Sequence, residues 1–121
     1  MRGLSDVSEG LQARIASLRA RVGYGYPWWL RPFLDRNVVA ITIGRRVYLS
    51  PSLTSRASSE LEKLLRHELA HVEQVLHHGL VRFLYLYAAE YIALRRSGLP
   101  ADSAYRRISF EVEAFAAEEA V

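Results

Sequence analysis

Residues 64–74 read Leu-Leu-Arg-His-Glu-Leu-Ala-His-Val-Glu-Gln and contain the pattern His-Glu-x-x-His. On a helix, residues four apart lie about 40° apart around the axis and about 6 Å along it. The imidazoles of His67 and His71 can therefore reach one metal ion at about 2.0–2.1 Å, the usual distance from nitrogen to Zn²⁺. Glu68 lies one step round the same helix, where it could take a proton from a water on that metal. The alternative is two solvent-facing histidines on an ordinary amphipathic helix.

The residues around this motif predict a helix with one buried face. Residues 59–62 form a capping box, a Ser followed three residues later by a Glu, which is typical of a helix start. A helix over roughly residues 60–77 is predicted by apolar residues at helical spacing, namely Leu61, Leu65, Leu69, Val72 and Leu76. The motif borders this stripe, so a metal there would have a dry wall behind it. This context favours the metal site over the solvent-facing alternative.

Length and composition predict one globular domain, residues 1–121, because a chain of 121 residues can build only one core. Half of the residues are hydrophobic and 24% are charged, which argues against disorder. Cysteine is absent, so a metal here must be held by nitrogen and oxygen ligands. The net charge of +3 is scattered in short arginine pairs, so we expect no nucleic-acid partner. The start of the chain does not resemble a signal peptide, and we expect a cytoplasmic protein.

Ahead of the motif, the sequence predicts a helix over residues 5–22, capped by Ser5 or Asp6 and ended by Gly23, and then a β-hairpin. The strands of the hairpin are residues 38–43 and 46–50, joined by a turn at positions 44–45. Two strands are not stable alone, so they must pack on the helices. The free edge, expected along residues 45–50, could accept an extended peptide as an added strand, or a loop could cover it.

Two further segments are rich in apolar residues. Residues 24–33 contain two Pro and one Gly, which exclude a long regular element. We expect this segment to pack as a lid on the core, with Trp28 and Trp29 in contact with the domain; the alternative is a membrane-touching or ligand-stacking loop. Residues 80–94 are apolar almost all round but shorter than the about 20 residues that a membrane span needs. They predict no membrane span but a central helix or the interface of a homodimer.

A third metal ligand must come from outside the motif, because a catalytic zinc has three protein ligands and an open position. On an unbroken helix, His77 lies about 9 Å along the axis from His71 and about 120° off its face. Gln74 also stands where a Gly would have to turn the chain back. A carboxylate on a second helix is then the natural ligand. Glu111 and Glu113 lie on opposite flanks of the last predicted helix, whose packing face comprises Phe110, Ala114, Ala117 and Val121.

At these residues the chain resembles the gluzincin metallopeptidases, in which the histidines of His-Glu-x-x-His and a Glu on a following helix bind zinc. It is most similar to small bacterial stand-alone minimal gluzincin-like proteins, over roughly residues 38–120. The shared pattern lies at residues 67–72, 79, 83–91 and 104–114. The resemblance implies an α+β, mostly helical zincin-like fold, with a small β-hairpin against the motif helix and a C-terminal Glu helix. It also implies one Zn²⁺ held by His67, His71 and Glu111, with Glu68 as general base.

The implied function is a zinc-dependent metallopeptidase that acts on a peptide or protein substrate. In gluzincins an Asp near the third ligand orients a zinc-binding His. Phe115 occupies that place here, so Glu118 or Glu73 is expected to substitute. This departure leaves open a zincin fold that has lost catalysis and serves as a binding or dimerisation module. The candidates for stabilising an oxyanion are Tyr105, Tyr48 and Arg106.

Overall fold

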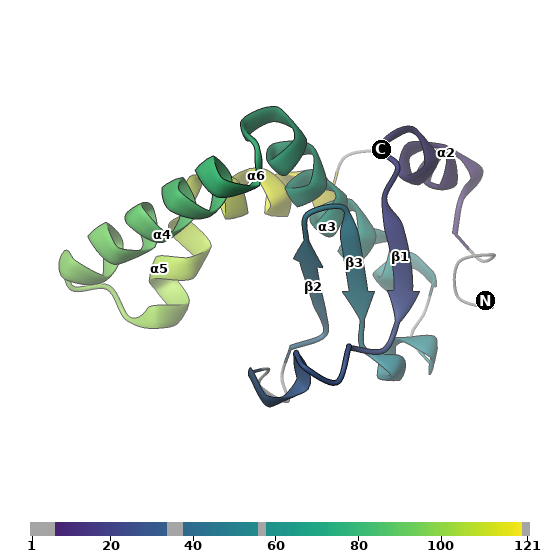
Figure 1. Cartoon of the computed structure of the whole chain (residues 1–121), viewed down its shortest axis with the longest axis horizontal. Helices are drawn as coiled ribbons and strands as arrows, with labels where there is room; N and C mark the ends of the chain where they lie inside the picture. Colours follow the sequence, from purple (N-terminus) through teal and green to yellow (C-terminus); the bar gives the residue numbers. More distant parts are fainter. Residues whose placement is uncertain (1–6, 34–37, 56–57, 120–121) are drawn as a thin grey trace.

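The computed structural model describes residues 7–33, 38–55 and 58–119, and it has an α+β fold in which a small sheet packs on a long helix (Figure 1). The first described helix is α2 (Glu9–Ser17). Its N-cap is Ser8, whose hydroxyl accepts a hydrogen bond from the backbone N–H of Leu11. Leu11 is buried in the core between the helices and the sheet.

The predicted helix over residues 5–22 is wrong in its second half. The helix ends at Ser17, Arg19 adopts a φ of 54°, and Arg21–Tyr24 form strand β1. In this strand Val22 lies beside Val47 in a parallel pairing, and it packs against the core as a strand residue. Gly23, the predicted stop, therefore lies inside a strand, and the predicted caps lie outside the described residues.

The predicted hairpin is confirmed as β2 (Ala40–Ile43) and β3 (Arg46–Leu49), which pair antiparallel around Gly44. The strand order is β1-β3-β2, so β3 is the central strand. The expectation that residues 45–50 offer a free edge is therefore wrong, because β3 is hydrogen-bonded on both sides. The free edge of the hairpin belongs to β2. A short 3-10 helix, η2 (Pro51–Ser55), leads from β3 towards the motif helix.

The motif lies on α3 (Ser58–His78), which packs across the inner face of the sheet and confirms the predicted helix. Three residues of the predicted stripe are completely buried, namely Leu65, Leu69 and Val72. Leu76 is instead 41% exposed, because the last turn of α3 extends past the sheet (Figure 1). The Glu62 carboxylate accepts a hydrogen bond from the backbone N–H of Ser8 and pairs with Arg66. It thus ties the N-terminus of α2 to α3.

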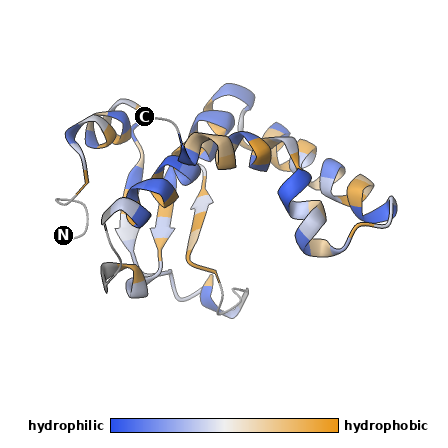
Figure 2. Ribbon diagram, turned by 180° about the vertical axis from the view of Figure 1, so that it is seen from behind, coloured by the Kyte–Doolittle hydropathy of each residue, from blue (hydrophilic) through white to orange (hydrophobic). Residues whose placement is uncertain are grey.

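The remaining three described helices lead away from the sheet and then back towards it. After Gly79, α4 (Leu80–Arg96) and α5 (Ala101–Arg107) project away from the sheet, and α6 (Ser109–Glu118) runs back along α3 (Figure 1). The helix predicted at residues 80–94 is not central, since it projects away from the sheet (Figure 2) and several of its large apolar side chains are exposed. Across the described ranges, no helix combines the length and the apolarity that crossing a bilayer requires.

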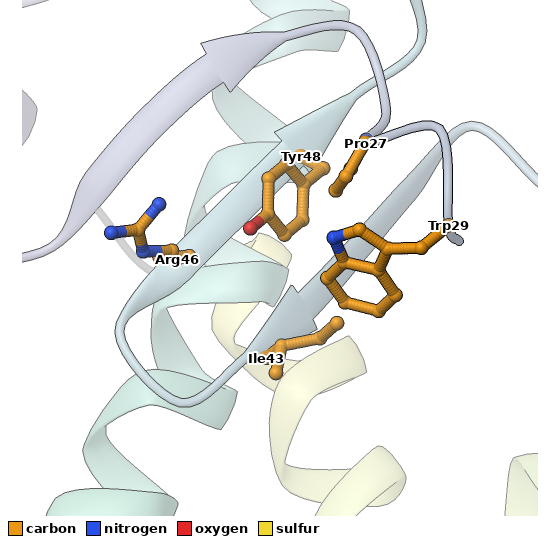
Figure 3. A pocket seen from close by; sticks show the side chains of 5 residues that line it. All are labelled: Pro27, Trp29, Ile43, Arg46 and Tyr48. Carbon is orange, nitrogen blue, oxygen red and sulfur yellow. The ribbon is translucent and has the colours of Figure 1, made fainter. Parts of the chain in front are cut away.

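The aromatic segment ahead of β2 does not close over the core. It leads into a short 3-10 helix, η1 (Arg31–Phe33). Trp28 is 81% exposed, so its predicted packing against the domain is wrong. Trp29 is 49% exposed and lies with Pro27 over the outer face of the sheet, beside Ile43 (Figure 3).

Candidate metal centre

Three buried side chains from two helices converge at the site. His67 and His71 come from α3 and Glu111 comes from α6. The Nε2 atom of His67 lies 3.0 Å from Oε1 of Glu111, and the Nε2 atom of His71 lies 3.1 Å from the same oxygen. The helical spacing of four places both rings on one face, and the packing of α6 against α3 delivers the carboxylate. The structure thus brings together the three predicted ligands.

The other ring nitrogens of the two histidines are bonded to different partners. His67 Nδ1 lies 2.8 Å from Oε2 of Glu118, a carboxylate oxygen that can only accept. His67 therefore donates through Nδ1. His71 Nδ1 lies 2.9 Å from Oε1 of Gln74, one helical turn further along α3.

The orientation of the Gln74 amide settles which atom donates to which. Its Nε2 donates to the backbone carbonyl of Phe110 and to Oε1 of Glu113, both at 2.9 Å. Carbonyl and carboxylate oxygens can only accept, so the NH₂ group must face them. Oε1 of Gln74 then faces His71, whose Nδ1 carries the proton and donates it.

With Nδ1 as the donor in both rings, the Nε2 atoms of His67 and His71 both face Oε1 of Glu111: protonated, they donate to this carboxylate, and deprotonated, their lone pairs are free for a cation. The three ligand atoms lie within 4.8 Å of one another, and lone pairs so close need protons or a cation between them. A tetrahedral zinc with ligands at about 2.0–2.1 Å separates neighbouring ligand atoms by roughly 3.3 Å. The separations here are 3.0 and 3.1 Å. Two imidazoles and one carboxylate in this arrangement fit a metal ion.

The contacts among His67, His71 and Glu111 also shift the pKa values of all three side chains. Burial lowers the pKa of His67 and of His71, but the hydrogen bonds to Glu111, the charge of Glu68 and the hydrogen bonds at Nδ1 together outweigh burial and raise both pKa values above the ordinary one. Burial raises the pKa of Glu111, but hydrogen bonds from the two histidines hold it well below its usual range. Protons and a metal ion would compete for the same lone pairs.

Glu68 lies between the sheet and the metal-binding residues. It is 7% exposed, and the Thr42 hydroxyl on β2 donates to its Oε1 at 2.6 Å. Burial raises the pKa of Glu68 more than this hydrogen bond lowers it. The charges of His71, His67 and Glu111 also act on Glu68. The predicted base therefore shares the electrostatic environment of the site and is held by the free-edge strand.

Two tyrosines approach Glu111 from other helices. The Tyr87 hydroxyl on α4 donates to Glu111 Oε2 at 2.6 Å and so holds the oxygen that the histidines leave free. Burial and the Glu111 carboxylate raise the pKa of Tyr87 well above its ordinary value. Burial and the same carboxylate also raise the pKa of Tyr105, which is 37% exposed. Tyr105 thus lies near the Glu111 carboxylate.

The two other expected oxyanion stabilisers do not face the site. Tyr48 alternates with the buried Leu49 on β3 and therefore lies on the outer face of the sheet (Figure 3). The guanidinium of Arg106 lies 5.7 Å from the centre of the Phe115 ring, which also contacts the rings of His67 and Tyr105. Phe115 thus stands between Arg106 and the metal-binding residues. Neither expectation is supported by these positions.

Three other residues considered from the sequence, His77, Glu73 and Glu113, do not join the three converging side chains. His77 is exposed on a surface pocket and does not belong to the converging group of the described residues. Glu73 pairs with Arg14 at 3.0 Å, so of the two substitutes for the missing Asp, only Glu118 contacts a histidine of the motif. Glu113 is exposed and contacts Gln74.

Sequence reasoning missed the contacts of Thr42, Gln74 and Tyr87. Thr42 is polar at an inward-facing position of the hairpin, and that exception to the alternation was a usable signal. Gln74 was considered only as the absence of a Gly, although its spacing of three from His71 predicts contact on a helix. Tyr87 has no comparable signal, because its contact depends on how α6 returns beside the start of α4 and along α3.

Comparison with known families matches residues 34–79 to the eCIS core domain. The matched segment is less than half of the chain and is similar to that domain from β2 to the end of α3. It includes the whole His-Glu-x-x-His motif and Thr42, and it ends before Glu111. The family description names neither a metal nor a peptidase activity. No curated protein and no solved structure matches this chain.

Proposed function

We propose that this chain is a zinc-dependent metallopeptidase, with His67, His71 and Glu111 as zinc ligands and Glu68 as general base. The observation that carries the proposal is the convergence of the Nε2 atoms of His67 and His71 on one oxygen of Glu111. Two imidazoles, a carboxylate and an open fourth position form a ligand set of catalytic zinc in peptidases. Bound there, Zn²⁺ would polarise a peptide carbonyl and acidify a water.

Glu68 would move the proton in this reaction. The Thr42 hydroxyl holds its Oε1, so Oε2 is the atom that takes a proton from the attacking water and passes it to the leaving nitrogen. Burial supports this role, because it raises the pKa of Glu68 towards the pH at which a general base works best. Tyr105 keeps its proton, since its pKa is raised, and would donate to the oxyanion that develops on the carbonyl.

The substrate would be an extended peptide along the free edge of β2. The N–H and C=O groups of an edge strand can pair with an added strand. Thr42 lies on this strand and contacts Glu68, so a peptide bound there would pass beside the general base. This replaces the edge along residues 45–50 that the sequence predicted.

Zinc binding is the first test of the proposal. We expect chain purified without chelators to contain about one Zn²⁺ per molecule by elemental analysis. Stripping the metal should lower the melting temperature, and added zinc should restore it, because a ligand at 100 times its Kd stabilises the folded state by about 2.7 kcal/mol. The loaded chain should also cleave members of a peptide library, as followed by mass spectrometry, whereas the stripped chain should not.

The control is Mg²⁺, which prefers oxygen ligands and should leave the melting temperature of the stripped chain unchanged. A chain that holds no zinc and takes up none on titration would contradict the metal site. A chain that binds zinc and cleaves no peptide would favour a zincin-like module without catalysis.

The outer side of α4 favours a dimerisation module as the second candidate function. Val81, Tyr85, Ala88 and Ile92 are spaced by four, three and four, opposite the buried Phe83. Val81 is 82% exposed, Tyr85 69% and Ile92 49%. Exposed apolar patches of this kind mark interaction sites in soluble proteins. The arm projects away from the sheet, so this side is open to another molecule (Figure 2).

We propose a second copy of this chain as the occupant of the α4 stripe. In an antiparallel pair centred between Tyr85 and Ala88, the small side chain of Ala88 allows the helices to approach. Val81 of one copy would then lie near Ile92 of the other, and Tyr85 near Ala88. The stripe would thus complement itself, as the interface of a two-fold dimer must.

Light scattering at micromolar concentration tests this dimer. We expect the wild-type chain to be dimeric and Tyr85→Glu to be monomeric, because the substitution places a charge in the centre of the apolar stripe. Ala93→Glu adds the same charge to the same helix outside the stripe and should remain dimeric. A monomeric wild-type chain would contradict the dimer, whatever its zinc content.

A further inference from the structure

We infer that Glu113 is a positioning residue for the metal site, which acts on His71 through the amide of Gln74. Gln74 is 7% exposed, and its amide lies between the ring of His71 and the carboxylate of Glu113. Glu113 itself contacts none of the proposed zinc ligands in the described structure. The inference rests on the proposed function, because it concerns the histidine that would bind the zinc.

The orientation of the Gln74 amide matters because it decides whether Nδ1 of His71 donates or accepts a hydrogen bond. In the observed orientation, Oε1 accepts from Nδ1 of His71 and leaves the Nε2 lone pair free. Turned over by 180°, the amide would present its NH₂ group to Nδ1, which would then have to accept. The neutral ring would carry its proton on Nε2 and could offer no lone pair to a metal there.

Glu113 is the strongest of the groups that decide this orientation. Its carboxylate accepts from Nε2 of Gln74 at 2.9 Å, and such charge-assisted hydrogen bonds are roughly twice as strong as neutral ones. The carbonyl of Phe110 accepts from the same nitrogen. In the turned orientation, the side-chain oxygen of Gln74 would face two acceptors, and both hydrogen bonds would be lost.

Of the two glutamates that share a surface pocket with Gln74, only Glu113 is hydrogen-bonded to its amide in the described structure. Gln74, Glu113 and Glu73 line the same surface pocket, through which water can reach the amide and compete for its hydrogen bonds. Glu73 is engaged by Arg14, with its Oε1 accepting from the guanidinium. Glu113 therefore supplies the carboxylate that acts on Gln74, and Glu73 is a matched control in the same pocket.

The second histidine needs no such relay. His67 donates from Nδ1 directly to the Glu118 carboxylate, which has no turned-over form. The two ligands are thus oriented by different means, one by a carboxylate and one by an amide that a carboxylate holds. Loss of Glu113 should therefore disturb His71 and leave His67 unchanged.

A double-mutant cycle on zinc affinity tests the inference, with competition against a chromophoric chelator as the measurement. Residues that orient metal ligands typically contribute about 10–100-fold to affinity. We expect Glu113→Leu to weaken zinc binding about tenfold and Gln74→Leu to weaken it by at least as much. Adding Glu113→Leu to Gln74→Leu should cause no further loss, since the relay is already broken.

Two variants separate orientation from charge. Glu113→Gln loses the charge but keeps an oxygen that can accept from Gln74, so it should lose clearly less affinity than Glu113→Leu. Glu73→Leu removes a carboxylate from the same pocket without touching Gln74, and its affinity should stay within about twofold of wild type. In the zinc-loaded protein, NMR should show faster solvent exchange of the His71 Nδ1 proton in Glu113→Leu, with the His67 proton unchanged.

The outcomes are distinct. Equal losses in Glu113→Gln and Glu113→Leu, or additive losses in the double variant, would overturn the inference in favour of a simple charge effect. Unchanged affinity in Glu113→Leu would overturn it alone, with zinc binding by the wild-type chain still in support of the proposed function. A wild-type chain that binds no zinc would overturn both.

Discussion

Replacing Glu111 with Gln is expected to lower zinc affinity at least about a hundredfold while the chain remains folded. Structural zinc sites with four ligands bind with about 10–16 kcal/mol, which is roughly 3 kcal/mol for each ligand. Since 1.4 kcal/mol corresponds to a factor of ten, loss of one ligand costs about a hundredfold or more. The amide keeps the shape of the side chain but offers a neutral oxygen in place of an anionic one. Competition with a chelator measures the change.

The matched control is Glu119→Gln, which removes a carboxylate next to the end of the same helix. Glu119 is exposed and pairs with Lys63 at 3.0 Å, so its loss should leave zinc affinity within about twofold of wild type. Circular dichroism of both stripped variants should match that of wild type. Wild-type affinity in Glu111→Gln would contradict the assignment of Glu111 as the third ligand.

The parts of the fold that the sequence predicted depend on local patterns. The motif helix follows from leucines at helical spacing, and the hairpin follows from β-branched residues on either side of Gly44. Strand β1 could not be predicted in this way, because it forms by parallel pairing with β3, a strand more than twenty residues away. Val22 fits the apolar stripe of a helix and the inward face of a strand equally well. Its tertiary partner, Val47, decided between them.

In the candidate site, too, local sequence patterns predicted some features and only tertiary contacts decided others. The spacing of four between His67 and His71 fixes their common face, and the family resemblance selected Glu111 over Glu113. Burial agrees with that selection, since Glu111 is 3% exposed and Glu113 lies on the surface. The hydroxyl of Tyr87 reaches Glu111 only because α6 returns beside α4 and α3, and no local sequence pattern predicts that return.

The two candidate functions meet on one helix. The inner side of α4 holds the Glu111 carboxylate through Tyr87, and its outer side carries the stripe proposed to bind a second copy. Pairing of two copies through that stripe would steady the helix from which Tyr87 donates. A dimer is therefore compatible with the proposed catalysis, and Tyr85→Glu should be assayed for zinc affinity as well as for mass.

Glu68→Gln is expected to lower kcat by about 10²–10⁴-fold, the usual contribution of general acid–base catalysis, while zinc affinity stays near that of wild type. Gln is isosteric and can still accept the Thr42 hydrogen bond through its side-chain oxygen, so the packing beside β2 is preserved. It cannot take a proton from water, which removes the step assigned to Oε2. The measurement is single-turnover cleavage of a peptide that the wild-type chain hydrolyses, at matched zinc content.

Thr42→Val provides the comparison that separates proton transfer from positioning. It keeps the β-branched shape on β2 and removes only the hydroxyl that donates to Glu68. Because the carboxylate remains, this variant should lose far less activity than Glu68→Gln. Its pH–rate profile should shift, since the hydrogen bond from Thr42 lowers the pKa of Glu68 and its loss should raise that pKa. Equal residual activity in wild type and Glu68→Gln would show that any observed cleavage does not use this site.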